Sequence, residues 1–214
     1  MTKHAYDSAD REAVYRVIAE RRDMRHFAGG AVDEDVLARL LSAAHQAPSV
    51  GLMQPWRIVR VTDLALRHAL HDHVEVERRH TADAMGERAD EFMRLKVQGI
   101  LDCAEVLVVA LGDDRERHVF GRRTMPHMDL ASVSCAIQNL WLAARAEGIG
   151  MGWVSMFVSE VVAELIGARE GAEPVAILCL GPVEEFYRRP MLEQEKWTSV
   201  RPLEELLAEN SWPG

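Results

Sequence analysis

The chain has 214 residues, of which 48% are hydrophobic and 28% are charged, as in an ordinary globular protein. Its formal net charge of -9 at pH 7 argues against general binding to nucleic acid or to an anionic membrane, because both depend on a basic surface. No apolar run reaches the roughly 18 residues of a membrane span, and the N-terminal ten residues lack the apolar core of a signal peptide, so we expect a cytoplasmic protein.

Two helices are predicted first along the chain. Residues 8–20 form the first, and residues 32–47 form the second, with Asp33 as its N-cap. The second helix carries a periodic apolar face, made of Val36, Leu37, Leu40, Leu41 and Ala44.

A loop must follow over residues 47–56, because its two prolines and a glycine break any regular element. Residues 56–61 then read as a short strand. The charged stretch from 63 to about 99 predicts one or two helices on the surface.

The second half of the chain contains the core elements. Residues 104–112 and 173–181 are β-branched, apolar runs and predict buried strands. The segment from Leu130 to Ala144 has no charged residue, which indicates a helix buried on all sides, within the core or in a subunit interface. Residues 148–157 predict a strand, and a helix begins at Ser159. We therefore expect one α+β domain over residues 1–214, with helices wrapped around a mainly antiparallel sheet.

Several common types of site are disfavoured. Cys103, Cys135 and Cys179 are dispersed in apolar stretches, which predicts buried thiols rather than disulfides or metal ligands. The "GIGMG" run at 148–152 follows a helix and enters a strand, the reverse of a dinucleotide-binding loop. Four histidines at 68–80 have no ligand-rich partner segment, so a solvated helix face is the better interpretation.

The segment "RRDMRHF", residues 21–27, is the strongest candidate for a site. Guanidinium groups suit phosphate because their fork presents paired donors to two oxygens. The alternative is a solvated, salt-bridged turn, which is what most charge runs form. Asp23 stands among the three arginines and would repel an anion, so a binding site here needs a separate reason for this carboxylate.

Three segments together resemble the nitroreductase-like flavoproteins: "RRDMRHF", "AAHQAPSVGLMQPWRIVRV" and "MDLASVSCAIQNLWLAARAEGIGMGWVSMF". Within that superfamily, "RRDMR", "APSVGLMQPWR", "TMPHMDL" and "GWVSMF" are similar to the branch of 5,6-dimethylbenzimidazole synthases. The resemblance runs from about residue 10 to residue 207. It implies a nitroreductase-like fold and a homodimer with one FMN at each of two subunit interfaces.

The resemblance also implies a set of flavin-binding residues. Arg21, Arg22 and Arg25 would hold the phosphate, ribityl chain or ring, and Arg201 would be a second phosphate ligand. Gly152 and Ser155 would approach the reactive edge of the flavin. The complete implied set is Arg21, Arg22, Asp23, Met24, Arg25, Pro48, Ser49, Gln98, Gly152, Ser155 and Arg201.

The reaction implied by the resemblance explains the carboxylate. Reduced FMN, as substrate, reacts with O2 as co-substrate and is fragmented to 5,6-dimethylbenzimidazole, the lower ligand base of vitamin B12. Such a fragmentation requires proton removal, and we expect Asp23 to act as the base, with Ser155 orienting the same edge. The neighbouring guanidinium groups should keep Asp23 ionised. A separate flavin reductase would supply the reduced FMN.

Two other functions stay open. The first is an NAD(P)H-dependent nitroreductase or flavin reductase that keeps its FMN through many turnovers. The second is a non-catalytic protein that binds or delivers flavin. Asp23 and the "GWVS" run argue against the first.

Overall fold

The computed structural model describes residues 3–212 of the chain. Its centre is a four-stranded sheet in the order β1-β2-β4-β3, in which every neighbouring pair is antiparallel. The strands are β1 (Trp56–Arg60), β2 (Glu105–Leu111), β3 (Gly150–Val154) and β4 (Glu173–Gly181). The predicted α+β class with an antiparallel sheet is confirmed.

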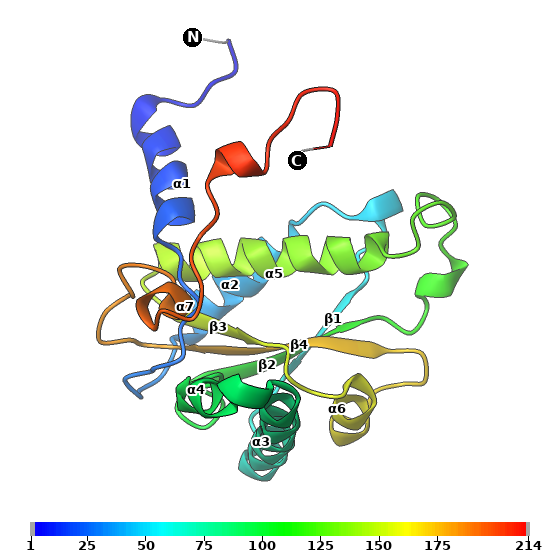
Figure 1. The fold of residues 1–214 in the computed structure, drawn as a ribbon. Coiled ribbons are helices and arrows are strands. Elements are labelled where there is room, and N and C mark those ends of the chain that lie inside the picture. The colour runs from blue at the N-terminus through cyan, green and yellow to red at the C-terminus, as the bar shows by residue number, and fades with distance from the viewer. Residues whose placement is uncertain (1–2, 213–214) are drawn as a thin grey trace.

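Helices cover both faces of this sheet (Figure 1). On one face lie α2 (Glu34–His45) and the long α5 (Met128–Ala146), with α1 (Ser8–Glu20) beside α5. On the other face lie α3 (Leu64–Ala84), α4 (Ala89–Arg94) and α6 (Ser159–Leu165). The short helix α7 (Met191–Gln194) follows β4, and single 3-10 turns occupy Val50–Leu52, Gly86–Arg88, Arg115–Arg117 and Leu203–Glu205.

The side chains of the central strands explain why both faces need cover. Successive residues of a strand point to opposite faces. Along β2, Leu107 and Val109 therefore join the core under α2 and α5, while Val106 and Val108 join the core over α3 and α6. A strand that is buried on both faces reads as a continuous apolar run, which is how β2 and β4 appear in the sequence.

The first three helices begin where the sequence predicts them. Asp33 caps α2 by accepting hydrogen bonds from the backbone N–H groups of Asp35 and Val36. Asp7 and Asp63 cap α1 and α3 in the same way. The charged stretch predicted as one or two helices forms α3 and α4, and it ends at Arg94 rather than near residue 99.

Helix α5 is covered only in part. Eight of its residues are buried, six of them in the core with the sheet and α2, whereas Leu130, Ala131, Cys135 and Gln138 are exposed along one stripe. Burial within the chain therefore does not account for the uncharged stretch from Leu130 to Ala144, and the alternative of a subunit interface remains. The prediction of three buried thiols is confirmed for Cys103 and Cys179 and is wrong for Cys135, which lies on this exposed stripe.

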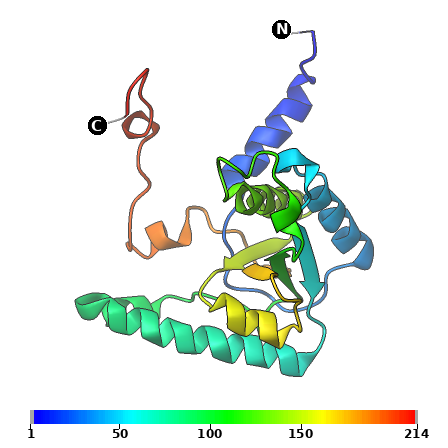
Figure 2. The ribbon, with the colours of Figure 1, turned by 90° about the vertical axis from the view of Figure 1, so that its right-hand side faces the viewer.

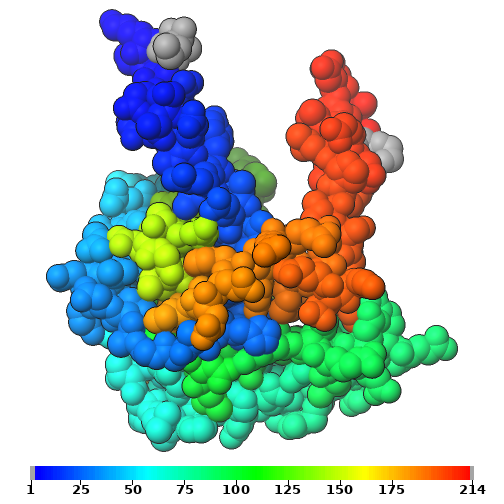
Figure 3. Space-filling view, turned by 90° about the vertical axis from the view of Figure 1, so that its left-hand side faces the viewer, coloured from blue at the N-terminus to red at the C-terminus, as the bar shows by residue number. Residues whose placement is uncertain are grey.

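Two segments project from the body as arms (Figures 2 and 3). One is α1, which has no buried residue, and the other is the C-terminal segment 200–212, which is exposed throughout. Both carry large apolar side chains in the open, including Tyr15 and Ile18 on α1 and Leu203 and Leu207 on the C-terminal arm. Within residues 3–212, no helix combines the length and apolar character that crossing a bilayer requires.

Candidate functional site

A cavity of about 610 Å³ opens beside β3, the edge strand of the sheet. The "RRDMR" segment supplies Arg21, Arg22, Asp23 and Arg25 to one side of it. The end of β3 and the following loop supply Trp153 to Met156. The remaining wall is mostly apolar and is built from α4 and the segment around α7, with Met85, Phe92, Leu95, Val97, Met191, Leu192 and Trp197.

The "RRDMR" segment lies along β3 as a short additional strand. Asp23 pairs with Met151 in a parallel bridge, and the N–H of Met24 donates to the carbonyl of Met151 at 2.9 Å. This close approach needs a glycine at position 152, because a Cβ there would lie 2.2 Å from the carbonyl oxygen of Met24. The indole N–H of Trp141 closes the arrangement by donating to the carbonyls of Arg22 and Met151, both at 3.1 Å.

Asp23 is held by two different donors. Its Oδ1 accepts from the backbone N–H of Trp153 at 3.0 Å, and its Oδ2 accepts from Nη2 of Arg25 at 2.5 Å. The same Nη2 also donates to the carbonyl of Trp153 at 2.9 Å. The carboxylate is thereby fixed at the wall of the cavity, which the exposed Ser155 also lines.

The ionisation of Asp23 is governed by burial more than by the arginines. Although 41% of its side-chain surface is open, protein atoms crowd the carboxyl, and this burial raises the pKa of Asp23 above its ordinary value. Arg25, the N–H of Trp153 and Arg21 lower the pKa without offsetting the burial. The guanidinium groups of Arg25 and Arg21 therefore favour the ionised form of Asp23, as expected, but burial outweighs their effect on its pKa.

The remaining residues of the segment have distinct environments. The guanidinium of Arg21 lies over the ring of Trp141, 4.5 Å from its centre, and burial lowers the pKa of Arg21. Arg22 donates to the backbone carbonyls of Ala19, Arg21 and Arg188, so it ties the segment to the chain after β4. Met24 is buried in the core and does not line the cavity.

Other predicted site residues lie outside this cavity in the single chain. Pro48 and Ser49 form a separate turn at the end of α2, where Ser49 Oγ accepts from the N–H of Gln54 at 3.0 Å. Arg201 is exposed on the C-terminal arm and pairs with Glu205 at 3.2 Å. Among the described residues the structure therefore gathers Arg21, Arg22, Asp23, Arg25 and Ser155, and it separates Pro48, Ser49 and Arg201 from them.

Gln98 and Gly152 contact other residues of the chain and do not face the cavity. The Gln98 amide donates to Glu75 Oε1 at 3.2 Å and accepts from the N–H of Ile100 at 2.8 Å, which uses both of its ends. Gly152 lies under the backbone of Met24. The structure thus gives each a packing role, and neither is part of the cavity wall.

Sequence reasoning missed three residues that organise the site. Trp153 holds Asp23 and Arg25 through its main chain, and the "GWVS" motif in which it lies was a usable signal. Trp141 supports Arg21 and the extra strand from within the uncharged helix. Tyr187 accepts from the N–H of Arg25 at 3.3 Å and lies 2.5 Å from His26 Nδ1; nothing in the sequence around Tyr187 indicates this contact.

Comparisons with known proteins found relatives over most of the chain. The family model for the nitroreductase family matches residues 18–182. A 5,6-dimethylbenzimidazole synthase of Rhodospirillum rubrum is 39% identical, over 92% of this chain and 94% of that protein. A second, from Rhodobacter capsulatus, is 36% identical over 93% and 97%.

Solved structures show the same fold. A BluB-like flavoprotein from Clostridium difficile superposes with a TM-score of 0.70 at 19% identity, covering 92% of this chain and 99% of that one. An iodotyrosine deiodinase bound to FMN and 3-iodo-L-tyrosine has a TM-score of 0.71 at 20% identity, covering 93% and 100%. At these identities the likeness concerns the fold alone.

Proposed function

The chain belongs to the nitroreductase family, and on that premise we propose that it is a 5,6-dimethylbenzimidazole synthase acting on reduced FMN and O2. Curated relatives with that name, up to 39% identical over 92% of the chain, support the proposal. The structural observation that carries it is the fixed carboxylate of Asp23. An enzyme that only passes electrons through FMN has no evident need for a base held in this way beside Ser155.

The cavity suits a flavin in size and in the distribution of its groups. A volume of about 610 Å³ lies in the usual range of small-molecule sites. Arg21 and Arg22 on one side suit the phosphate and the ribityl hydroxyls. The apolar wall with Phe92 and Trp197 suits the ring system. Pro48, Ser49 and Arg201 would complete the site from a second subunit.

The residues of this chain supply positioning and proton transfer. Bound reduced flavin supplies the electrons for O2 and also the carbon skeleton of the product. C1′ of its five-carbon ribityl chain would supply the extra carbon of the imidazole ring, and the other four carbons would leave as erythrose 4-phosphate. The pyrimidine part of the flavin ring would leave as a separate oxidised fragment that carries the oxygen atoms of O2. Asp23 accepts a proton near C1′ and N5, while the hydroxyl of Ser155 orients the same edge. A raised pKa suits a base, because it brings the proton affinity of the carboxylate closer to that of the groups it serves.

The direct test is to mix the protein with chemically reduced FMN in air and to search for products by chromatography with mass spectrometry. We expect 5,6-dimethylbenzimidazole and erythrose 4-phosphate in equal amounts. Oxidised FMN without a reductant is the control and should give neither. Repeated absence of dimethylbenzimidazole with folded protein, fully reduced FMN and oxygen would falsify the proposed reaction.

The nitroreductase alternative makes the opposite prediction for bound flavin. A nitroreductase purifies with a stable yellow flavin, which excess NADPH bleaches reversibly. A synthase must exchange its flavin, so we expect a colourless or weakly coloured protein. A flavin carrier without catalytic activity would bind FMN and yield no ring fragments in air.

We also infer that the protein is a homodimer. The exposed stripe of α5 and the apolar residues on both arms leave more apolar surface open than a stable monomer usually shows. Light scattering at micromolar concentration should give about twice the mass of the chain. Leu130→Asp on the stripe should weaken the dimer and FMN binding together, whereas a stable monomer of the unaltered protein that binds FMN would contradict the inference.

Arg21→Ala tests the binding role of the arginine segment. Losing a hydrogen bond to a charged group costs about 1.5–3 kcal/mol, so flavin affinity should fall roughly 10- to 150-fold. Arg79→Ala removes a charge from the exposed face of α3 and serves as the control. Equal FMN affinities for the two variants would support the alternative that the segment is a solvated turn.

Three further properties of the protein remain predictions. The first is that residues 1–214 act as a single flavin-binding domain, which the one continuous sheet supports. The second is a separate flavin reductase as the source of reduced FMN. The third is a cytoplasmic location, which fractionation of the producing cell would test.

A further inference from the structure

The turn that carries Ser49 has a strained backbone. Gly51, Leu52 and Gln54 all have positive φ angles, of 55°, 53° and 48°. Leucine and glutamine rarely adopt this conformation, and two such residues within one short turn persist only where the surroundings impose it. Strain of this kind gathers at functional sites, so the contacts that impose it bear on function.

Two groups of contacts impose the turn. From α5, Ser132 Oγ accepts from the N–H of Val50 at 3.1 Å and donates to the carbonyl of Met128 at 2.6 Å. From the loop between β2 and α5, the ring of Phe120 lies 3.1 Å from the position of a Cβ on Gly51. Val50 packs in return over Gly121, where a Cβ would lie 2.2 Å from its γ-methyl group. The turn and this loop therefore interlock.

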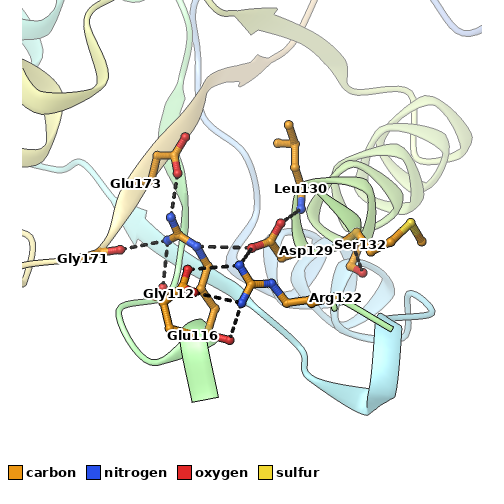
Figure 4. Close-up of polar contacts among 10 residues, drawn as sticks. Gly112, Glu116, Arg122, Asp129, Leu130, Ser132, Gly171 and Glu173 are labelled. Carbon is orange, nitrogen blue, oxygen red and sulfur yellow. Dashed lines mark hydrogen bonds and ion pairs between the residues drawn. The ribbon is translucent and has the colours of Figure 1, made fainter. Parts of the chain in front are cut away.

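The loop is in turn fixed by one buried carboxylate. Asp129, in the first turn of α5, is 4% exposed. Its Oδ2 pairs with Arg122 Nη2 at 3.3 Å and with Arg115 Nε at 3.2 Å, and its Oδ1 accepts from the N–H of Leu130 at 2.7 Å (Figure 4). Arg115 and Arg122 stand at two points of the loop, so one side chain gathers both ends of the segment that bears Phe120.

Arg115 also connects this group of ion pairs to the sheet. It donates to the carbonyls of Gly112 at 3.1 Å and Gly171 at 2.8 Å, and it pairs with Glu173 at 2.7 Å. Gly112 and Gly171 lie next to the ends of β2 and β4. These contacts fix the position of the loop relative to the sheet (Figure 4).

We propose that Asp129 is a positioning residue for the flavin site: through Arg115, Arg122 and the loop they hold, it keeps the strained turn at 49–54 in the conformation that presents Ser49. The inference rests on the proposed function, because only the family assignment brings Ser49 to a flavin. Asp129 itself does not line the cavity of this chain. Its effect on FMN passes through the backbone of the turn.

The experiment compares Asp129→Asn with Glu116→Gln. Both substitutions keep the shape of the side chain and remove a carboxylate that pairs with Arg122, but Glu116 is on the exposed side of that arginine. Hydrogen–deuterium exchange of flavin-free protein should show the amides of residues 49–54 exchanging faster in Asp129→Asn, and unchanged in Glu116→Gln. FMN affinity should fall about 10-fold in Asp129→Asn only, because a displaced contact group binds poorly.

Ser132→Ala gives a second and milder route to the same turn. It removes the acceptor for the N–H of Val50 and leaves in place the carboxylate that Arg115 and Arg122 share, so it remains informative if Asp129→Asn does not fold. Ser132→Ala should also speed the exchange of the amides of residues 49–54 and weaken FMN binding. A variant could instead unfold at a lower temperature while the amides of residues 49–54 exchange at the wild-type rate and FMN binds with wild-type affinity. This result would show a role in folding alone and would overturn the proposal.

Failure of the proposed function would give a different result from failure of the role proposed for Asp129. In that case the unaltered protein would form no dimethylbenzimidazole, whereas the exchange and FMN-binding measurements would still report on the turn. Where dimethylbenzimidazole is formed, Asp129→Asn should convert a smaller share of its bound reduced FMN to product and return more of it as oxidised FMN.

Discussion

Replacement of Asp23 by asparagine is expected to leave FMN bound and to lower formation of dimethylbenzimidazole by about 10²–10⁴-fold, the usual contribution of a general base. The amide keeps the shape of the side chain and can still accept from the N–H of Trp153, which holds Oδ1 in the native protein. It cannot accept a proton. Flavin affinity should hold or rise, because Arg21 and Arg25 lose a competing anion while the phosphate remains. Reduced FMN should return as intact oxidised FMN.

The measurement pairs an FMN titration with product detection on the same sample. Asp72→Asn, on the exposed face of α3, removes a carboxylate far from the cavity wall and should behave as the unaltered protein. If Asp23 were only structural, affinity and product would fall in proportion. Near-normal product from folded Asp23→Asn would exclude it as the base and direct attention to Ser155.

Arg25→Ala is expected to impair both binding and chemistry. The Arg25 side chain is 11% exposed, and its Nη2 joins Asp23 to the carbonyl of Trp153. Loss of a charge-assisted contact should weaken FMN binding roughly 10- to 150-fold. Product formation from bound flavin should fall further, by about 10²-fold, because the carboxylate loses the group that orients it. Arg25→Lys keeps the charge but not the fork, and should lie between the two.

The pH dependence of Arg25→Ala gives a second readout. A base must be ionised, so activity is present above the pKa of Asp23 and is lost as pH falls through it. Burial raises this pKa above 3.8, and Arg25 is the strongest of the influences that lower it. Removal of Arg25 should therefore move the acidic limb of the rate profile to higher pH, and Arg25→Lys should move it less. An unchanged limb would mean that another group controls the ionisation.

Much of the fold was accessible from the sequence because local patterns carried it. The strand at 173–181 was predicted to the residue, and Asp33 was identified as a cap, because an apolar run and a capping carboxylate act on their immediate neighbours. The site was predicted as a set of residue types. The guanidinium pattern of residues 21–25 favoured an anion site, and the resemblance to the flavoprotein family gave Asp23 its expected role as a base.

The sequence by itself therefore determined the class of fold, the family and the presence of a carboxylate among arginines. Only the tertiary structure decided what each group does. It set Gly152 under the backbone of Met24, engaged Gln98 with Glu75, and brought Trp153 and Tyr187 to the segment from more than 120 positions away. It also made burial the largest influence on the pKa of Asp23, because burial depends on every atom packed around a carboxyl, whereas the sequence displays only its neighbours along the chain.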